Sequence, residues 1–256
     1  MKSCILLTHV FVENNEHHKV DQPNFVVKHF RKNNPDAYII VTGHGLKPNS
    51  LEKYCDHVHW ENEIIRSEIG FGHPILVNVG LDHAKKKGFS HILKTRLDGI
   101  NMIPNIFEWC AERLGDKKYL TTQPTNIDNF LLNDLFNFGS VDFMKGCWKT
   151  EGWHEGNIDG LVPHATRFFD MCPETDWVDA LRNNLVVKNL PDLKWIDFRP
   201  TENWSQLHDK KNEMLSNTLP DYKKYIWGSP GLLWDDDNQL ITKKNIRGEL
   251  LTEGML

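Results

Sequence analysis

Short apolar runs alternate with amphipathic stretches through the first hundred residues of the chain. Runs with the length of buried strands lie at residues 4–8, 37–42 and 91–96, and residues 57–60 predict a weaker strand. Residues 20–32 and 74–87 instead place their apolar side chains three or four positions apart, which is typical of helices. Because strands alternate with helices, we expect an α/β fold with a mostly parallel sheet flanked by helices.

The second half of the chain has a less regular pattern. It predicts helices over 103–114, 141–148 and 174–187, and strands over 118–122 and 193–198. Residues 150–164 are rich in Gly, His, Asn and Asp, which predicts an exposed loop. No repeat or clear linker divides the chain, so we expect one domain over residues 1–256, with a less regular C-terminal extension from about residue 200.

Composition supports a folded protein and disfavours one class of partner. Hydrophobic residues make up 39% and charged residues 25% of the 256 positions, enough for a sizeable core. The formal net charge of -5 argues against a protein that mainly binds nucleic acid, which needs a basic surface. A local basic pocket for a nucleotide remains compatible with this charge.

Cysteine usage and hydropathy bear on the compartment. The five cysteines are scattered without a Cys-x-x-Cys pair, which favours a reducing cytosol and gives no sign of zinc. No apolar run approaches the roughly 20 residues of a membrane span, and the N-terminus lacks the pattern of a signal peptide. We therefore expect a soluble cytoplasmic protein, and peripheral contact with a membrane stays open.

The segment at 91–99 is the most informative for chemistry. Its apolar start leads into Lys94 and Arg96, and Asp98 and Gly99 then close the strand at a turn. In open α/β sheets, ligands bind beyond the carboxyl ends of the strands. Lys94 or Arg96 can neutralise phosphate oxygens there, and Asp98 can hold a divalent cation. The alternative is that these charges form ordinary surface ion pairs.

The end of the first strand offers further binding groups. Thr8 can form a hydrogen bond to a nucleobase, and His9 can reach a ribose or a phosphate, so both are candidates for the same site. No Gly-x-Gly-x-x-Gly follows this strand, which disfavours a dinucleotide-binding enzyme.

Four segments occur in an order that matches a known family. They are Thr8-His9, the strand Ile39-Ile40-Val41-Thr42-Gly43, the segment 92–98 and the segment Asn133-Asp134-Leu135-Phe136-Asn137-Phe138-Gly139, and Pro173-Glu174 follows them. Over residues 3–185 the chain resembles the WavE-type lipopolysaccharide-synthesis family, which is similar to glycosyltransferases of the GT-A fold. It departs from the Asp-x-Asp of other GT-A enzymes because Arg96 replaces the first acid.

This resemblance implies transfer of a sugar from a nucleotide-diphosphate donor to a glycan acceptor, with Mn²⁺ or Mg²⁺ as cofactor. Asp98 is then a metal or ribose contact, and His208 is a further metal ligand, with His164 as the alternative. Asp134 and Glu174 are the candidate catalytic bases, and Asp176 competes with them. Asp134 leads because it stands inside an apolar segment, where burial makes an unpartnered carboxylate a better proton acceptor.

The acceptor implied by the resemblance is a lipopolysaccharide or another surface polysaccharide. Trp153, inside the Gly- and His-rich loop, is a candidate platform for a sugar ring. A non-catalytic protein that binds a nucleotide or a carbohydrate on the same scaffold is the competing interpretation, because Arg96 stands where an acid is expected.

Overall fold

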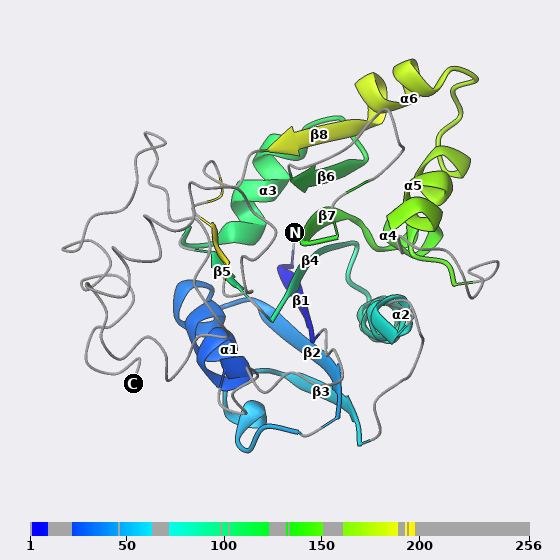
Figure 1. The fold of residues 1–256 in the computed structure, drawn as a ribbon. Helices are drawn as coiled ribbons and strands as arrows, with labels where there is room; N and C mark the ends of the chain where they lie inside the picture. Colours follow the sequence, from blue (N-terminus) through cyan, green and yellow to red (C-terminus); the bar gives the residue numbers. More distant parts are fainter. Residues whose placement is uncertain are drawn as a thin grey trace, which may run out of the picture.

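A mixed sheet of seven strands forms the centre of the molecule, and helices lie against both of its faces (Figure 1). The computed structural model describes residues 2–9, 22–45, 47–62, 72–97, 99–101, 103–122, 132, 134–150, 161–188, 193 and 195–197. The expected α/β class, with a mostly parallel sheet flanked by helices, is confirmed.

The elements follow one another in a βα pattern through the first half of the chain and in a mixed pattern afterwards. The first half holds β1 (Cys4–Thr8), α1 (Gln22–Asn33), β2 (Tyr38–His44), the short helix η1 (Leu51–Lys53), β3 (His57–Glu61), α2 (Gly72–Lys86), β4 (His91–Arg96) and β5 (Gly99–Asn101). The second half holds α3 (Ile106–Leu114), β6 (Tyr119–Thr122), β7 (Phe136–Ser140), α4 (Val141–Cys147), α5 (Leu161–Asp170), α6 (Trp177–Asn184), β8 (Leu185–Lys188) and β9 (Trp195–Asp197).

The strand order in the large sheet is β3-β2-β1-β4-β7-β6-β8. Strand β7 runs antiparallel to both neighbours, and every other pairing in this sheet is parallel. The carboxyl ends of β1, β2 and β4 therefore lie at one edge, together with the amino end of β7. The chain builds β1, β2 and β3 outward and then returns to place β4 on the other side of β1, which creates a switch point between β1 and β4.

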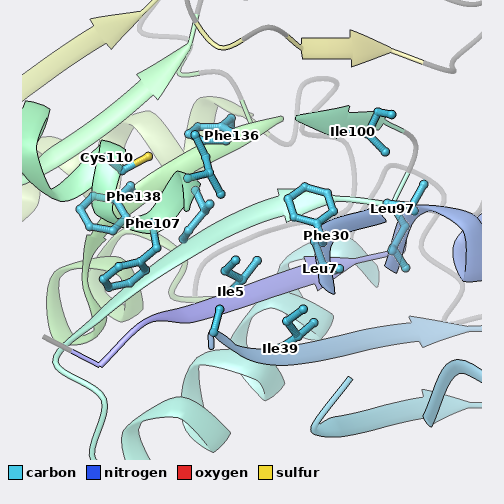
Figure 2. Packing of buried hydrophobic residues seen from close by; sticks show 14 of the residues in the cluster. Ile5, Leu7, Phe30, Ile39, Leu97, Ile100, Phe107, Cys110, Phe136 and Phe138 are labelled. Atoms are coloured by element: carbon cyan, nitrogen blue, oxygen red, sulfur yellow. The ribbon is translucent and has the colours of Figure 1, made fainter. Parts of the chain in front are cut away.

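One face of the sheet packs against α1 and α3. Ile5 and Leu7 of β1 alternate with residues of the opposite face, and Phe30 of α1 and Phe107 of α3 lie over them in one buried cluster (Figure 2). This alternation is the pattern expected of a strand that is covered on both sides.

The other face packs against α2, α4 and α5. Leu6 of β1 belongs to this second buried cluster, together with Leu81 of α2 and Phe168 of α5. Gly80 allows α2 to come very close to β1, because a Cβ atom at this position would lie 2.3 Å from Leu6 Cδ1. Because α2 connects β3 to β4, and both strands run parallel to β1, the amino end of α2 lies toward the edge that holds the carboxyl ends of β1 and β2.

Two of the predicted elements have other bounds in the structure. The helix predicted over 174–187 ends at Asn184, and Leu185–Lys188 forms strand β8 instead, because the β-branched Val186 and Val187 pair in parallel with β6. The predicted loop over 150–164 overlaps α5, which begins at Leu161. Pro163 lies in the first turn of α5, where proline is compatible with a helix.

Candidate active site at the carboxyl edge of the sheet

The switch point between β1 and β4 brings predicted site residues together. Thr8 and Arg96 are register partners at the ends of these two strands, and Thr42 of β2 is the partner of Thr8 on its other side. All three side chains lie on the face that α2 covers, since Leu6 and Ile92 of the same strands face that helix layer. The sequence correctly placed Thr8 and Arg96 at one edge.

The side chain of Lys94 is not accessible to a phosphate ligand. Its side chain is fully buried, and its ammonium group donates to His73 Nε2 at 2.8 Å and to the backbone carbonyl of Asp134. The same ammonium group lies 4.7 Å from the centre of the Trp148 ring. These contacts tie the segment before β7 to the amino end of α2.

Arg96 forms the charged pair of the site. Its Nη1 lies 3.3 Å from Asp134 Oδ2, and the two side chains are 12% and 19% exposed. Both groups therefore stay partly accessible, in contrast to Lys94. Of the two cations in β4, Arg96 is the one that a bound diphosphate can reach.

The sequence offered no signal for His73. It is the second residue of α2 and lies at the amino end of that helix, with its Nε2 atom 3.5 Å from Asp134 Oδ2. Burial, and then the positive charge of Lys94, lower the pKa of His73 well below its usual value. His73 is therefore a neutral imidazole in contact with the candidate base.

Two hydroxyl groups mark the same edge. Thr8 Oγ1 and Thr42 Oγ1 are buried and find no hydrogen-bond partner among the residues that the structure describes. Buried hydroxyl groups normally find a partner, so the unfilled hydrogen-bonding capacity of these two marks the ends of β1 and β2 as a candidate binding edge.

His9 belongs to an aromatic group beside this site. Its buried ring lies 5.1 Å from the Trp60 ring and 6.4 Å from the His44 ring, measured between centroids. Burial lowers the pKa of His44. His9 and His44 thus lie at the carboxyl edge, packed among rings.

Glu174 and Asp176 lie elsewhere. Glu174 Oε1 accepts a hydrogen bond of 2.7 Å from Asn184, whose carbonyl accepts one from the backbone N–H of Lys118 at the amino end of β6. That end of β6 is the opposite edge of the sheet from Asp134. Asp176 caps α6 by accepting from the backbone of Val178 and Asp179. The structure therefore does not bring either acid to the predicted site.

His164 has a different setting from the one that the resemblance implied. Its ring is stacked on Trp148 at 4.2 Å between centroids, and its Nε2 atom lies 2.8 Å from the Tyr119 hydroxyl. Burial lowers the pKa of His164 to about 3. It is a core residue of the α5 layer.

Three predicted residues lie outside the described part of the chain: Asp98, Trp153 and His208. Within the described ranges, no group of three His, Cys, Asp or Glu side chains could hold a metal ion. The predicted metal site consequently depends on Asp98 and His208. No helix in the described part of the chain is long and apolar enough to cross a membrane.

No family model and no curated protein matches the chain, so membership of the WavE-type family is not confirmed. Solved structures are similar at low identity. One is named a nucleotide-diphospho-sugar transferase from Desulfovibrio desulfuricans, at 10% identity over 81% of this chain and 91% of the other, with a TM-score of 0.45. Another is a glycosyltransferase involved in glycosylation of the major capsid of PBCV-1, at 11% identity over 89% and 92%, with a TM-score of 0.47.

A third similar structure is named a glucose-1-phosphate thymidylyltransferase from Bacillus anthracis, at 10% identity over 77% of this chain and 89% of the other, with a TM-score of 0.46. All three TM-scores are below 0.5, so these similarities do not decide which reaction the chain performs. The assignment of a function therefore depends on the site itself.

Proposed function

We propose that this chain is a glycosyltransferase that moves a sugar from a nucleoside-diphosphate sugar to a hydroxyl group of a glycan. Support comes from the ion pair between Arg96 and Asp134 at the switch point between β1 and β4. This contact places a partly exposed cation beside a partly exposed carboxylate. Arg96 is also the register partner of Thr8, whose buried hydroxyl has no hydrogen-bond partner among the described residues. Diphosphate binding and proton removal need the cation and the carboxylate.

In this proposal the donor lies across the ends of β1 and β4. Thr8 and His9 contact the nucleoside, and Arg96 neutralises charge that develops on the diphosphate as it leaves. Lys94 does not contact the donor, and it positions Asp134 by donating a hydrogen bond to the backbone carbonyl of that residue. A divalent cation at Asp98 and His208 would add further charge neutralisation on the diphosphate.

The proposed chemistry is an inverting transfer with Asp134 as base. The acceptor hydroxyl oxygen forms a bond to the anomeric carbon of the donor sugar, and Asp134 takes the hydroxyl proton. The bond from that carbon to the diphosphate oxygen breaks, and its electron pair leaves with the diphosphate. The acceptor of this proposal is a glycan of a lipopolysaccharide or of another surface polysaccharide, and the place of reaction is the cytoplasm.

A direct test measures binding and turnover of UDP-glucose and GDP-mannose, with and without manganese. Binding in a calorimeter together with release of UDP or GDP supports an enzyme. Binding without any release, even when oligosaccharide acceptors are added, supports the alternative of a non-catalytic binding protein. That alternative gains weight from the same ion pair, because Arg96 already engages the carboxylate of Asp134.

Asp134→Asn tests the role of the base. We expect turnover to fall by roughly 10²- to 10⁴-fold, because the proton acceptor is lost. Donor affinity should hardly change, since the carboxylate acts mainly in the transition state. Sugar transfer at saturating donor and calorimetric titration measure the two effects.

Two variants serve as comparisons for that test. Asp142→Asn removes an exposed carboxylate of α4 that pairs with Lys85 at 2.7 Å, and it should keep full activity. Glu174→Gln should also keep its activity, because Glu174 lies at the opposite edge of the sheet. Loss of activity in Glu174→Gln alone would reverse the two roles. Full activity in both Asp134→Asn and Glu174→Gln would favour a retaining mechanism without a protein base.

A further inference from the structure

His73 is a buried histidine with contacts on one ring nitrogen only. The residue is 8% exposed, and its ring meets the Trp148 ring edge-on at 5.5 Å between centroids. Its Nε2 atom lies 2.8 Å from Lys94 Nζ and 3.5 Å from Asp134 Oδ2. His73 thus lies directly beside the group that we propose as the base.

The contact with Lys94 determines which nitrogen of His73 carries the proton. A lysine ammonium group has N–H donors and no acceptor, so His73 Nε2 must accept. In the neutral imidazole the single proton then resides on Nδ1. The lowered pKa of His73, which burial and Lys94 produce, agrees with a neutral ring.

The protonated nitrogen is left without an acceptor in the described part of the chain. His73 Nδ1 is buried, and none of the described residues forms a hydrogen bond with it. Buried N–H donors almost always have a partner, so an oxygen that accepts a hydrogen bond is expected next to His73.

We propose that the Nδ1–H group of His73 donates a hydrogen bond to a hydroxyl oxygen of a sugar bound beside Asp134. This inference rests on the proposed function, because that function puts a sugar at the carboxylate. His73 then has two tasks that use different atoms. Its Nε2 atom accepts from Lys94, and its Nδ1 atom orients the sugar whose bond is broken or formed.

Two substitutions separate these tasks. In His73→Asn, the side-chain amide can place an N–H near the position of Nδ1, and the contact with Lys94 is lost. In His73→Gln, the longer side chain can place its oxygen near the position of Nε2, which keeps an acceptor for Lys94 and removes the Nδ1 donor. Thermal unfolding of both variants reports how much each one disturbs the fold.

UDP-glucose and GDP-mannose are the probes, with UDP and GDP as partners that lack the sugar. We expect His73→Gln to weaken binding of the nucleotide sugar, or to raise KM for the glycan acceptor, by roughly 3- to 10-fold, the effect of one hydrogen bond. His73→Asn should show a smaller change in both quantities than His73→Gln. If only the binding of the nucleotide sugar weakens, His73 donates to the transferred sugar. If only the KM of the acceptor rises, His73 donates to the acceptor sugar.

The opposite order of effects in the two variants would overturn the inference. If His73→Asn loses affinity while His73→Gln behaves like the wild type, His73 serves only as the partner of Lys94. Equal affinities of both variants and the wild type would also contradict it. If the wild type binds neither nucleotide sugar, the proposed function fails, and the inference fails with it.

The proton position can be measured without any substrate. Long-range ¹H–¹⁵N spectra of the wild type, with the signals of His73 assigned from their absence in His73→Gln, distinguish the two neutral forms of the ring. We expect a protonated Nδ1 and an unprotonated Nε2. A proton on Nε2 would refute the inference even for a protein that binds nucleotide sugars.

Discussion

Lys94 and Arg96 are two residues apart on one face of β4, yet their surroundings differ sharply. The ammonium group of Lys94 is enclosed between His73, the Asp134 carbonyl and the Trp148 ring. Arg96 lies at the strand end and keeps 12% of its side chain exposed. Lys94 therefore supports the site from inside, and Arg96 is positioned for the ligand.

This difference predicts opposite effects of two substitutions. Arg96→Gln keeps a donor for Asp134 but removes the charge, so affinity for UDP or GDP should fall by roughly 10- to 100-fold. Lys94→Met should leave this affinity nearly unchanged but destabilise the fold by about 1–3 kcal/mol, because His73 Nε2 and the Asp134 carbonyl lose their donor. Calorimetry and urea unfolding provide the measurements. A large loss of affinity in Lys94→Met alone would instead make Lys94 the phosphate ligand.

The sequence was sufficient for some site residues and insufficient for others. Thr8 and Arg96 each follow an apolar strand run, and the carboxyl ends of parallel strands share an edge, so their proximity could be predicted. His73 lies at the start of a helix without any local signature, and only the packing of α2 against β1 brings it to Asp134. Glu174 is the second candidate base because the resemblance includes the pair Pro173-Glu174, but the fold places Glu174 at the opposite edge of the sheet from Asp134.

At the scale of the elements, β7 connects the two halves of the sheet and carries the segment that follows Asp134. Its buried Phe136 and Phe138 face α3, and Asn137 faces the opposite layer as the register partner of Lys94. Asn137 donates a hydrogen bond of 3.1 Å to Thr121 of β6. This polar row across the sheet fixes the pairing of β4, β7 and β6 near the site.

Gly139 of β7 makes a close approach to the neighbouring strand. A Cβ atom at this position would lie 2.7 Å from the backbone oxygen of Lys118, which cannot move without displacing β6. We expect Gly139→Ala to destabilise the fold by about 1–3 kcal/mol through overpacking, measured by urea unfolding. Gly88→Asn is the comparison, because Gly88 has a φ of +79° and open space around it, and asparagine tolerates that conformation. A stability equal to the wild type in Gly139→Ala would show that β6 can shift.

The elements that the sequence predicted and those that it missed differ in their environment. Strands β1, β2 and β4 are covered on both faces, and each therefore contains an apolar run. In β7 the buried Asn137 interrupts the run, because its partner across the sheet is Lys94 and not an apolar residue. Strand β8 is partly exposed at the end of the sheet, and its side-chain pattern continues that of α6 without a break.

At the scale of the whole molecule, buried histidines link stability to pH. Burial lowers the pKa of His29 to about 4 and the pKa of His164 to about 3, and it lowers the pKa of His73 as well. In the unfolded chain these groups take up protons below about pH 6.5. Between that pH and their folded values the unfolded state binds more protons, so stability should fall as the pH decreases.

His29 allows this effect to be isolated. Its Nε2–H donates to the backbone carbonyl of Asn101 at 3.0 Å, which joins α1 to β5, and the residue is 1% exposed. His29→Gln can keep a donor for that carbonyl and does not titrate. From the folded pKa of about 4, His29 alone should remove roughly 3 kcal/mol of stability from the wild type as the pH falls from about 6.5 to about 4. Urea unfolding of both proteins across this range should therefore show a shallower pH dependence in His29→Gln, and identical slopes would mean that His29 is not the group that titrates.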